Sequence, residues 1–227
     1  QTQKLINFLE KWLKSKINTI LKSLIDLKDL KEKNSSIKAL SYQLYENNGV
    51  LERNKVSEYL KDLGQNERKI LRSLGVKFGR YHVFLFKLIK PDAVSLRTLL
   101  WKNFYQKYFN LKPPTFGLNF LEDSKIKNRN FMLLCGFEKF GNIYVRIDIL
   151  ERLFVQIINT SAEKEKEIKM TSNMLNLLGC SKDNFKKLLK NMGYKLIEKE
   201  NDLFFKYVPQ KNYKKINKKI LKESPFE

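Results

Sequence analysis

Residues 171–208, TSNMLNLLGCSKDNFKKLLKNMGYKLIEKENDLFFKYV, form the sharpest local pattern in the chain. A helical stretch ends at a Gly-Cys turn, and Ser181 is a suitable N-cap for the next helix. Two apolar-rich stretches then flank Glu200-Asn201-Asp202, which predicts a β-hairpin. A helix-turn-helix followed by a hairpin is the outline of a winged helix. The second helix has apolar residues at helical spacing, which we expect to face a core: Phe185, Leu188, Leu189 and Met192.

Lysines occupy the other side of this second helix. Lys182, Lys186 and Lys190 recur every four residues, and Lys187 lies beside them. Lysine contacts phosphate as a point charge without sequence preference, so these four are candidate nucleic-acid-binding residues. A solvated helix face is the alternative interpretation. Residues 209–227 are also rich in lysine and predict a basic tail.

Further upstream, residues 74–93, LGVKFGRYHVFLFKLIKPDA, set basic and aromatic residues around Gly79. Lys77, Arg80 and Tyr81 precede an apolar run, and we expect them to be exposed in a turn, available for phosphate contact and base stacking. Docking of this turn against a motor domain is the alternative. An RNA-recognition strand of the RRM type fits poorly, because the glycine that should follow the first basic residue is missing.

The apolar run itself predicts a strand over residues 83–89. Strands alternate sides, so either Phe84 and Phe86 or Val83 and Leu85 face a core, and we favour the Phe pair. Pro91 suits the first position of a following helix.

The remaining pattern gives the fold class. Helical spacing recurs over residues 4–32 and in shorter helices that stop at glycines, which indicates a helical bundle. We expect a mainly α fold with short β strands, an α+β class. It is organised as a helical bundle over 1–109, a linker over 110–130, a winged-helix-like unit over 131–208 and the basic tail over 209–227.

Composition points to a polyanionic partner. The chain has 227 residues, a formal net charge of +21 and a pI of about 9.8, which is typical of proteins that bind nucleic acid or an anionic surface. Of the 45 basic residues, 37 are lysine and 8 are arginine, and drift in an AT-rich genome explains part of that excess. Two separated cysteines, no signal peptide and no membrane-length apolar run lead us to expect a cytoplasmic protein without membrane contact.

Catalytic motifs are not evident. None of the nine glycines precedes lysine, so the sequence has no Walker-type phosphate loop. His82 is the single histidine, and within an apolar run we expect a packing role for it. We therefore predict no catalytic residue, no metal site and no cofactor in this chain.

Three stretches carry a family resemblance. Residues 40–101, from LSYQLYENNGVLERN to LRTLLW, GFEKFGNIYVRIDILERL at 136–153 and MLNLLGCSKDNFKKLLKNMGYK at 174–195 occur in the same order in the family. They resemble the C-terminal region of the alphaproteobacterial MgpS-type DExH-box RNA helicases, distant relatives of the mitochondrial degradosome RNA helicase. The resemblance covers about residues 37–195.

The resemblance implies two ATP-driven motor domains upstream, which alone would hold ATP and magnesium. The chain opens on glutamine, and we interpret it as a piece of a longer protein. The first functional hypothesis is a non-catalytic accessory region of an ATP-dependent RNA helicase that binds RNA and assists its motor. The alternatives are a protein-interaction module that docks a helicase or nuclease partner, and a winged-helix DNA-binding regulator.

Overall fold

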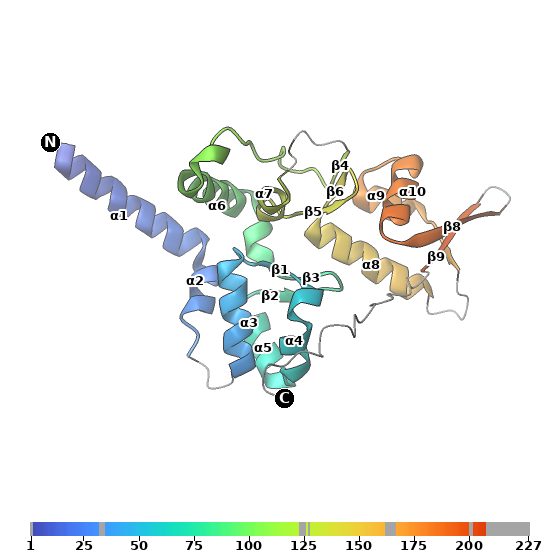
Figure 1. The fold of residues 1–227 in the computed structure, drawn as a ribbon, viewed down its shortest axis with the longest axis horizontal. Coiled ribbons are helices and arrows are strands. Elements are labelled where there is room, and N and C mark those ends of the chain that lie inside the picture. The colour runs from blue at the N-terminus through green and yellow to red at the C-terminus, as the bar shows by residue number, and fades with distance from the viewer. Residues whose placement is uncertain are drawn as a thin grey trace, which may run out of the picture.

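The computed structural model describes residues 2–31, 35–122, 126, 128–161, 167–199 and 202–207. Helices predominate and the strands form small antiparallel sheets, so the fold class is α+β (Figure 1). None of the helices within these ranges is long and apolar enough to cross a membrane. The hairpin turn expected at Glu200 and Asn201 and the basic tail expected over 209–227 lie outside the described residues.

The N-terminal helices differ from the continuous helix expected over 4–32. Helix α1 (Thr2–Ile20) projects from the body, and none of its residues is buried (Figure 1). The chain leaves helical geometry at Leu21, whose side chain is buried, and α2 (Lys22–Lys28) then packs on α3 (Ser35–Glu46). The other helices of this half are α4 (Ser57–Asp62), α5 (Gln65–Ser73) and α6 (Pro91–Phe104), with 3-10 turns at Arg53–Val56, Phe86–Ile89 and Gln106–Tyr108.

Three sheets share one topology. In each, the strand that comes last in sequence lies in the middle and pairs antiparallel with both neighbours, giving the orders β1-β3-β2, β4-β6-β5 and β7-β9-β8. The strands are β1 (Val50–Glu52), β2 (Val76–Phe78) and β3 (His82–Leu85); β4 (Phe120–Glu122), β5 (Phe137–Phe140) and β6 (Ile143–Arg146); and β7 (Ile168–Lys169), β8 (Tyr194–Lys199) and β9 (Asp202–Tyr207).

The helix before each hairpin ends in the same way. Helices α5, α7 (Arg129–Leu134) and α10 (Lys182–Asn191) are followed by Gly75, Gly136 and Gly193, with φ of 93°, 84° and 87°. These left-handed conformations favour glycine because it has no Cβ. Each glycine N–H donates to the carbonyl three residues earlier, at 3.0, 2.9 and 3.0 Å. The chain therefore contains three consecutive units with one local design.

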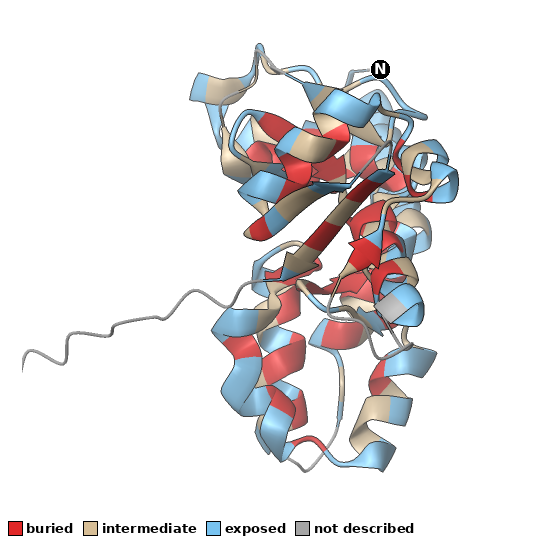
Figure 2. Cartoon of the chain, turned by 90° about the vertical axis from the view of Figure 1, so that its right-hand side faces the viewer, coloured by how far each residue is buried: buried red, intermediate tan, exposed pale blue. Residues whose placement is uncertain are grey.

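Packing joins the units. One core fills the space between the N-terminal helices and the first sheet, and another joins the second and third sheets through α8 (Ile147–Ser161) and α9 (Ser172–Leu178). Buried residues lie on the inward sides of helices and sheets, and exposed residues cover the outside (Figure 2).

The strand expected over 83–89 is shorter than predicted. It ends at Leu85, and a 3-10 turn leaves Phe86 36% exposed, so the expected core position of Phe86 was wrong. Both faces of β3 are buried because a core packs on each side of it, with Val83 and Leu85 in the N-terminal core and Phe84 packed near Ile147.

The segment expected as a linker contributes to the fold. Strand β4 lies inside residues 110–130 and pairs with β6. Val94 and Trp101 of α6 pack with Phe131 and Tyr144, so α6 and the second sheet share a core across this segment.

Candidate nucleic-acid interface

A groove of about 680 Å³ crosses the junction between the first sheet and helix α8. Helix α8 contributes Asp148, Glu151, Arg152 and Val155, whose spacing of three, four and seven places them on one helix face. The sheet side contributes all of β2 and Phe84 of β3. Five cationic side chains line the groove: Arg53, Arg72, Lys77, Arg80 and Arg152.

Aromatic rings lie among these cations. Phe78, Phe84, Phe86 and Phe154 line the same groove. The Arg72 guanidinium lies 5.5 Å from the Phe78 ring centroid, and that of Arg80 lies 5.4 Å from Phe154. Planar guanidinium groups beside aromatic faces offer both phosphate contacts and stacking surfaces.

The two acidic residues of the groove are both engaged by partners within the protein. Asp148 accepts from Nε and Nη2 of Arg146 at 2.7 and 3.0 Å, and Glu151 accepts from main-chain amides. Across the part of the chain that the structure describes, Arg72, Lys77, Arg80 and Arg152 are in no ion pair. The groove therefore presents a net positive surface.

Glu151 anchors the turn before β3. Its carboxylate accepts from the N–H groups of Arg80 at 2.5 Å and of Tyr81 and His82 at 2.9 Å each. A Cβ on Gly79 would lie 2.2 Å from the Glu151 Cδ, so glycine allows this close approach. The turn thus holds α8 against the first sheet and fixes Arg80 at the rim of the groove.

Tyr81 is not the exposed stacking residue that we expected. Its ring packs edge-on against Phe140 and Phe154, with centroids 6.4 and 5.7 Å apart, and its side chain is partly buried against the C-terminal core. Burial raises the pKa of its hydroxyl, which shares a hydrogen bond with Tyr194. Tyr81 therefore joins the first unit to the third. The turn docks on the chain's own C-terminal half.

A charged network lies behind the turn. His82 is 1% exposed, and its Nε2 lies 2.7 Å from Oε2 of Glu138, in keeping with a packing role. Arg129 forms an ion pair with the same Glu138 oxygen at 2.9 Å and with Glu52 at 2.7 Å. This network borders a second cavity of about 500 Å³, which shares Arg53 with the groove.

The pKa values in this network predict a pH dependence of stability. Burial alone would lower the pKa of His82, but Glu138 and Glu151 outweigh it, so the folded pKa lies above 6.5. The folded state then binds the proton more tightly, and this stabilisation is complete below pH 6.5 and lost as the pH rises through the folded value. We expect the free energy of unfolding to fall over that range. In H82Q this slope should disappear, as urea titrations at several pH values would show, and an unchanged slope in H82Q would contradict the assignment.

The expected lysine stripe on α10 lies away from the groove. Lys182 and Lys190 are exposed, whereas the Lys186 Nζ lies 2.6 Å from Oε1 of Glu198 on β8. This ion pair lowers the pKa of Glu198 and ties the middle of the stripe to the hairpin. Two lysines of the stripe remain open to solvent.

Lys187 is also engaged, because its Nζ lies 2.7 Å from Oε1 of Glu122 on β4. Among the residues predicted from sequence, the structure brings Lys77 and Arg80 together in the groove. It places Lys182, Lys186, Lys187 and Lys190 on a separate unit.

Sequence reasoning missed most of the groove. Arg53, Arg72 and Arg152, with Phe78 and Phe154, were not singled out. One signal could have found the arginines: the sequence has only 8 among its 45 basic residues, and four of the 8 line this groove. Codon drift toward lysine does not explain arginines that gather in one place.

Comparisons with protein-family models, with curated proteins and with solved structures find no match for this chain.

Proposed function

We propose that this chain binds single-stranded RNA in the groove between the first sheet and α8, as a non-catalytic accessory region of an ATP-dependent RNA helicase. The observation that carries the RNA-binding part is the lining of five cations and four aromatic rings, in which one of the two acids is paired with Arg146 and the other accepts from main-chain amides. Stacking on aromatic side chains requires unstacked bases, so this lining favours a single strand over a duplex.

We further propose that the C-terminal unit is a winged helix. Its support is the element order α8, β7, α9, α10, β8, β9 and the sheet order β7-β9-β8. The first unit has the same order, from α3 to β3. In helix-turn-helix proteins the second helix contacts nucleic acid, and here that helix carries the exposed Lys182 and Lys190. This surface would extend the RNA path beyond the groove.

The helicase part of the proposal depends on the resemblance over residues 37–195. The resemblance implies that motor domains bind ATP and magnesium, and in this proposal the present chain binds the RNA strand. Within the described residues, no group of three or more His, Cys, Asp or Glu side chains is arranged to hold a metal ion.

The central test removes three groove cations together. We expect the triple variant R72Q/K77Q/R152Q to bind an oligouridylate of about 12 nucleotides roughly 10- to 100-fold more weakly, because three phosphate contacts are lost. The slope of log K against log salt should shrink by about 2, since single strands lose about 0.7 per contact. Fluorescence anisotropy over a salt series measures both quantities.

Two variants with the same change in charge make the test specific. K4Q/K11Q/K14Q changes exposed lysines on α1, and K182Q/K186Q/K190Q changes the α10 stripe. We expect the α1 variant to bind nearly as the wild type does and the stripe variant to lose less than the groove variant. Equal losses in all three would mean that binding reflects net charge alone, and a folded wild type without RNA binding would favour an interaction module.

One observation favours that second candidate function. Helix α1 exposes an apolar face, with Leu5 59%, Phe8 65% and Trp12 52% accessible. Such a face is typical of helices that dock on another protein. We propose contact with the motor domains as the role of α1, alongside RNA binding in the groove.

A further inference from the structure

A smaller pocket adjoins the groove. Its volume is about 190 Å³, and it shares Phe86 and Asp148 with the groove lining. Sites for drug-sized ligands usually measure about 300–1,000 Å³, so this pocket suits a smaller group. A strand lying in the groove would pass its opening.

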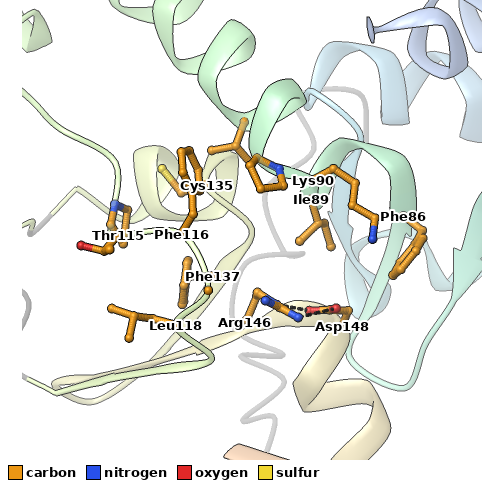
Figure 3. A pocket seen from close by; sticks show the side chains of 14 residues that line it. Phe86, Ile89, Lys90, Thr115, Phe116, Leu118, Cys135, Phe137, Arg146 and Asp148 are labelled. Carbon is orange, nitrogen blue, oxygen red and sulfur yellow. Dashed lines mark hydrogen bonds and ion pairs between the residues drawn. The ribbon is translucent and has the colours of Figure 1, made fainter. Parts of the chain in front are cut away.

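The pocket has apolar walls. Phe116 and Phe137 lie on one side, and Phe86, Ile89 and Lys90 lie on the other (Figure 3). Phe137 is buried, whereas Phe116 on the segment before β4 is 47% exposed. The walls therefore offer the flat apolar contacts that an aromatic guest requires.

Polar groups lie between these walls. The Arg146 guanidinium donates from Nε and Nη2 to the two carboxylate oxygens of Asp148. Among the described residues, its Nη1 has no hydrogen-bond acceptor. A guanidinium has five N–H donors and a carboxylate has several acceptor positions. The pair can thus donate to and accept from the edge of one planar heterocycle.

A cation lies where the pocket meets the groove. The Lys90 Nζ is 4.9 Å from the centroid of the Phe86 ring, and both residues line the pocket. A phosphate that links a base in the pocket to a strand in the groove would pass close to this ammonium group.

We propose that this pocket receives one unstacked base of a single strand bound in the groove, with the Arg146–Asp148 pair contacting the base edge. The proposal rests on the proposed RNA-binding function and adds a base-binding site to it. Phosphate contacts in the groove hold the strand, and the pocket holds one of its bases.

Two variants test the pocket without disturbing a core. F116A removes one wall, and L118W fills the space, and both side chains are more than 40% exposed. The probes are an oligouridylate of about 12 nucleotides and a ribose-phosphate strand of equal length without bases. We expect each variant to bind oligouridylate about tenfold more weakly, the usual loss for one stacked base, and to bind the abasic strand as the wild type does. The salt slope should not change, because no phosphate contact is lost.

The control is F104A, which removes an aromatic ring that is 80% exposed at the end of α6 and should leave binding unchanged. Unchanged oligouridylate binding in both pocket variants, with weakened binding in R72Q/K77Q/R152Q, would overturn the pocket and leave the proposed function standing. Equal losses on the abasic strand would also overturn it. A wild type that binds neither probe would overturn both proposals.

Discussion

Replacing Glu151 with alanine should lower the free energy of unfolding by about 4 kcal/mol, because three consecutive main-chain N–H groups lose a charged acceptor. Each such hydrogen bond contributes about 1.5–3 kcal/mol, and water replaces part of the loss. At about 2–4 °C per kcal/mol for a domain of this size, the melting temperature should fall by about 10 °C. Urea titration and thermal unfolding measure the two quantities.

E151A should also destabilise the turn before β3 locally. The amide protons of Arg80 and Tyr81 should exchange with solvent much faster in E151A than in the wild type. E151Q keeps an acceptor oxygen without the charge and should lose about half as much. E10A removes an exposed carboxylate on α1 and should stay within about 0.5 kcal/mol of the wild type. Equal stability of E151A and E10A would contradict the anchoring role.

The second large loss of stability is expected when Arg97 is replaced. Arg97 lies on α6 and is 2% exposed. Its Nη1 donates to the carbonyl of Asn48 at 2.6 Å, and its Nη2 donates to the carbonyls of Leu88 and, at 3.0 Å, Leu134. Burial lowers its pKa to about 10, so the group is still charged at neutral pH. It connects three segments that are far apart in the sequence.

R97M should therefore cost about 3–5 kcal/mol, because three carbonyl groups lose their donor, while removal of a buried charge offsets part of that loss. R97K should cost less than R97M but remain destabilising, since one ammonium cannot reproduce the planar fork. K38M on the exposed side of α3 is the matched control and should change little. A loss below about 1 kcal/mol in R97M, measured by urea unfolding, would show that the three segments hold together without this donor.

Elements formed by residues that are close in the sequence could be predicted from it, whereas elements formed by pairing with distant residues could not. Helix α10 and the β8-β9 hairpin were predicted because the apolar spacing, the Ser181 N-cap and the turn residues lie within or beside the segment itself. Strands β1, β2 and β4 have only two apolar residues each. Strands β1 and β4 exist because β3 and β6 pair with them from far along the chain, and β2 forms through the turn that joins it to β3. A three-residue strand has too short a pattern to be read alone.

The same distinction applies to the candidate site. Lys77 and Arg80 were found because basic and aromatic residues are neighbours in the sequence there. The position of Tyr81 depends on Phe140, Phe154 and Tyr194, and no local pattern near residue 81 shows that they meet. Arg152 was missed for the same reason, because its helix reaches the groove only through the fold.

The position of helix α8 sets the width of the groove. It starts directly after the second sheet, and its 15 residues extend about 22 Å into the C-terminal core. Its first three turns form one wall of the groove, while the other wall belongs to the first sheet. Glu151 and Phe154 of this helix contact the turn before β3, so the two walls of the groove should move as one body, and its width should stay constant when the C-terminal hairpin moves.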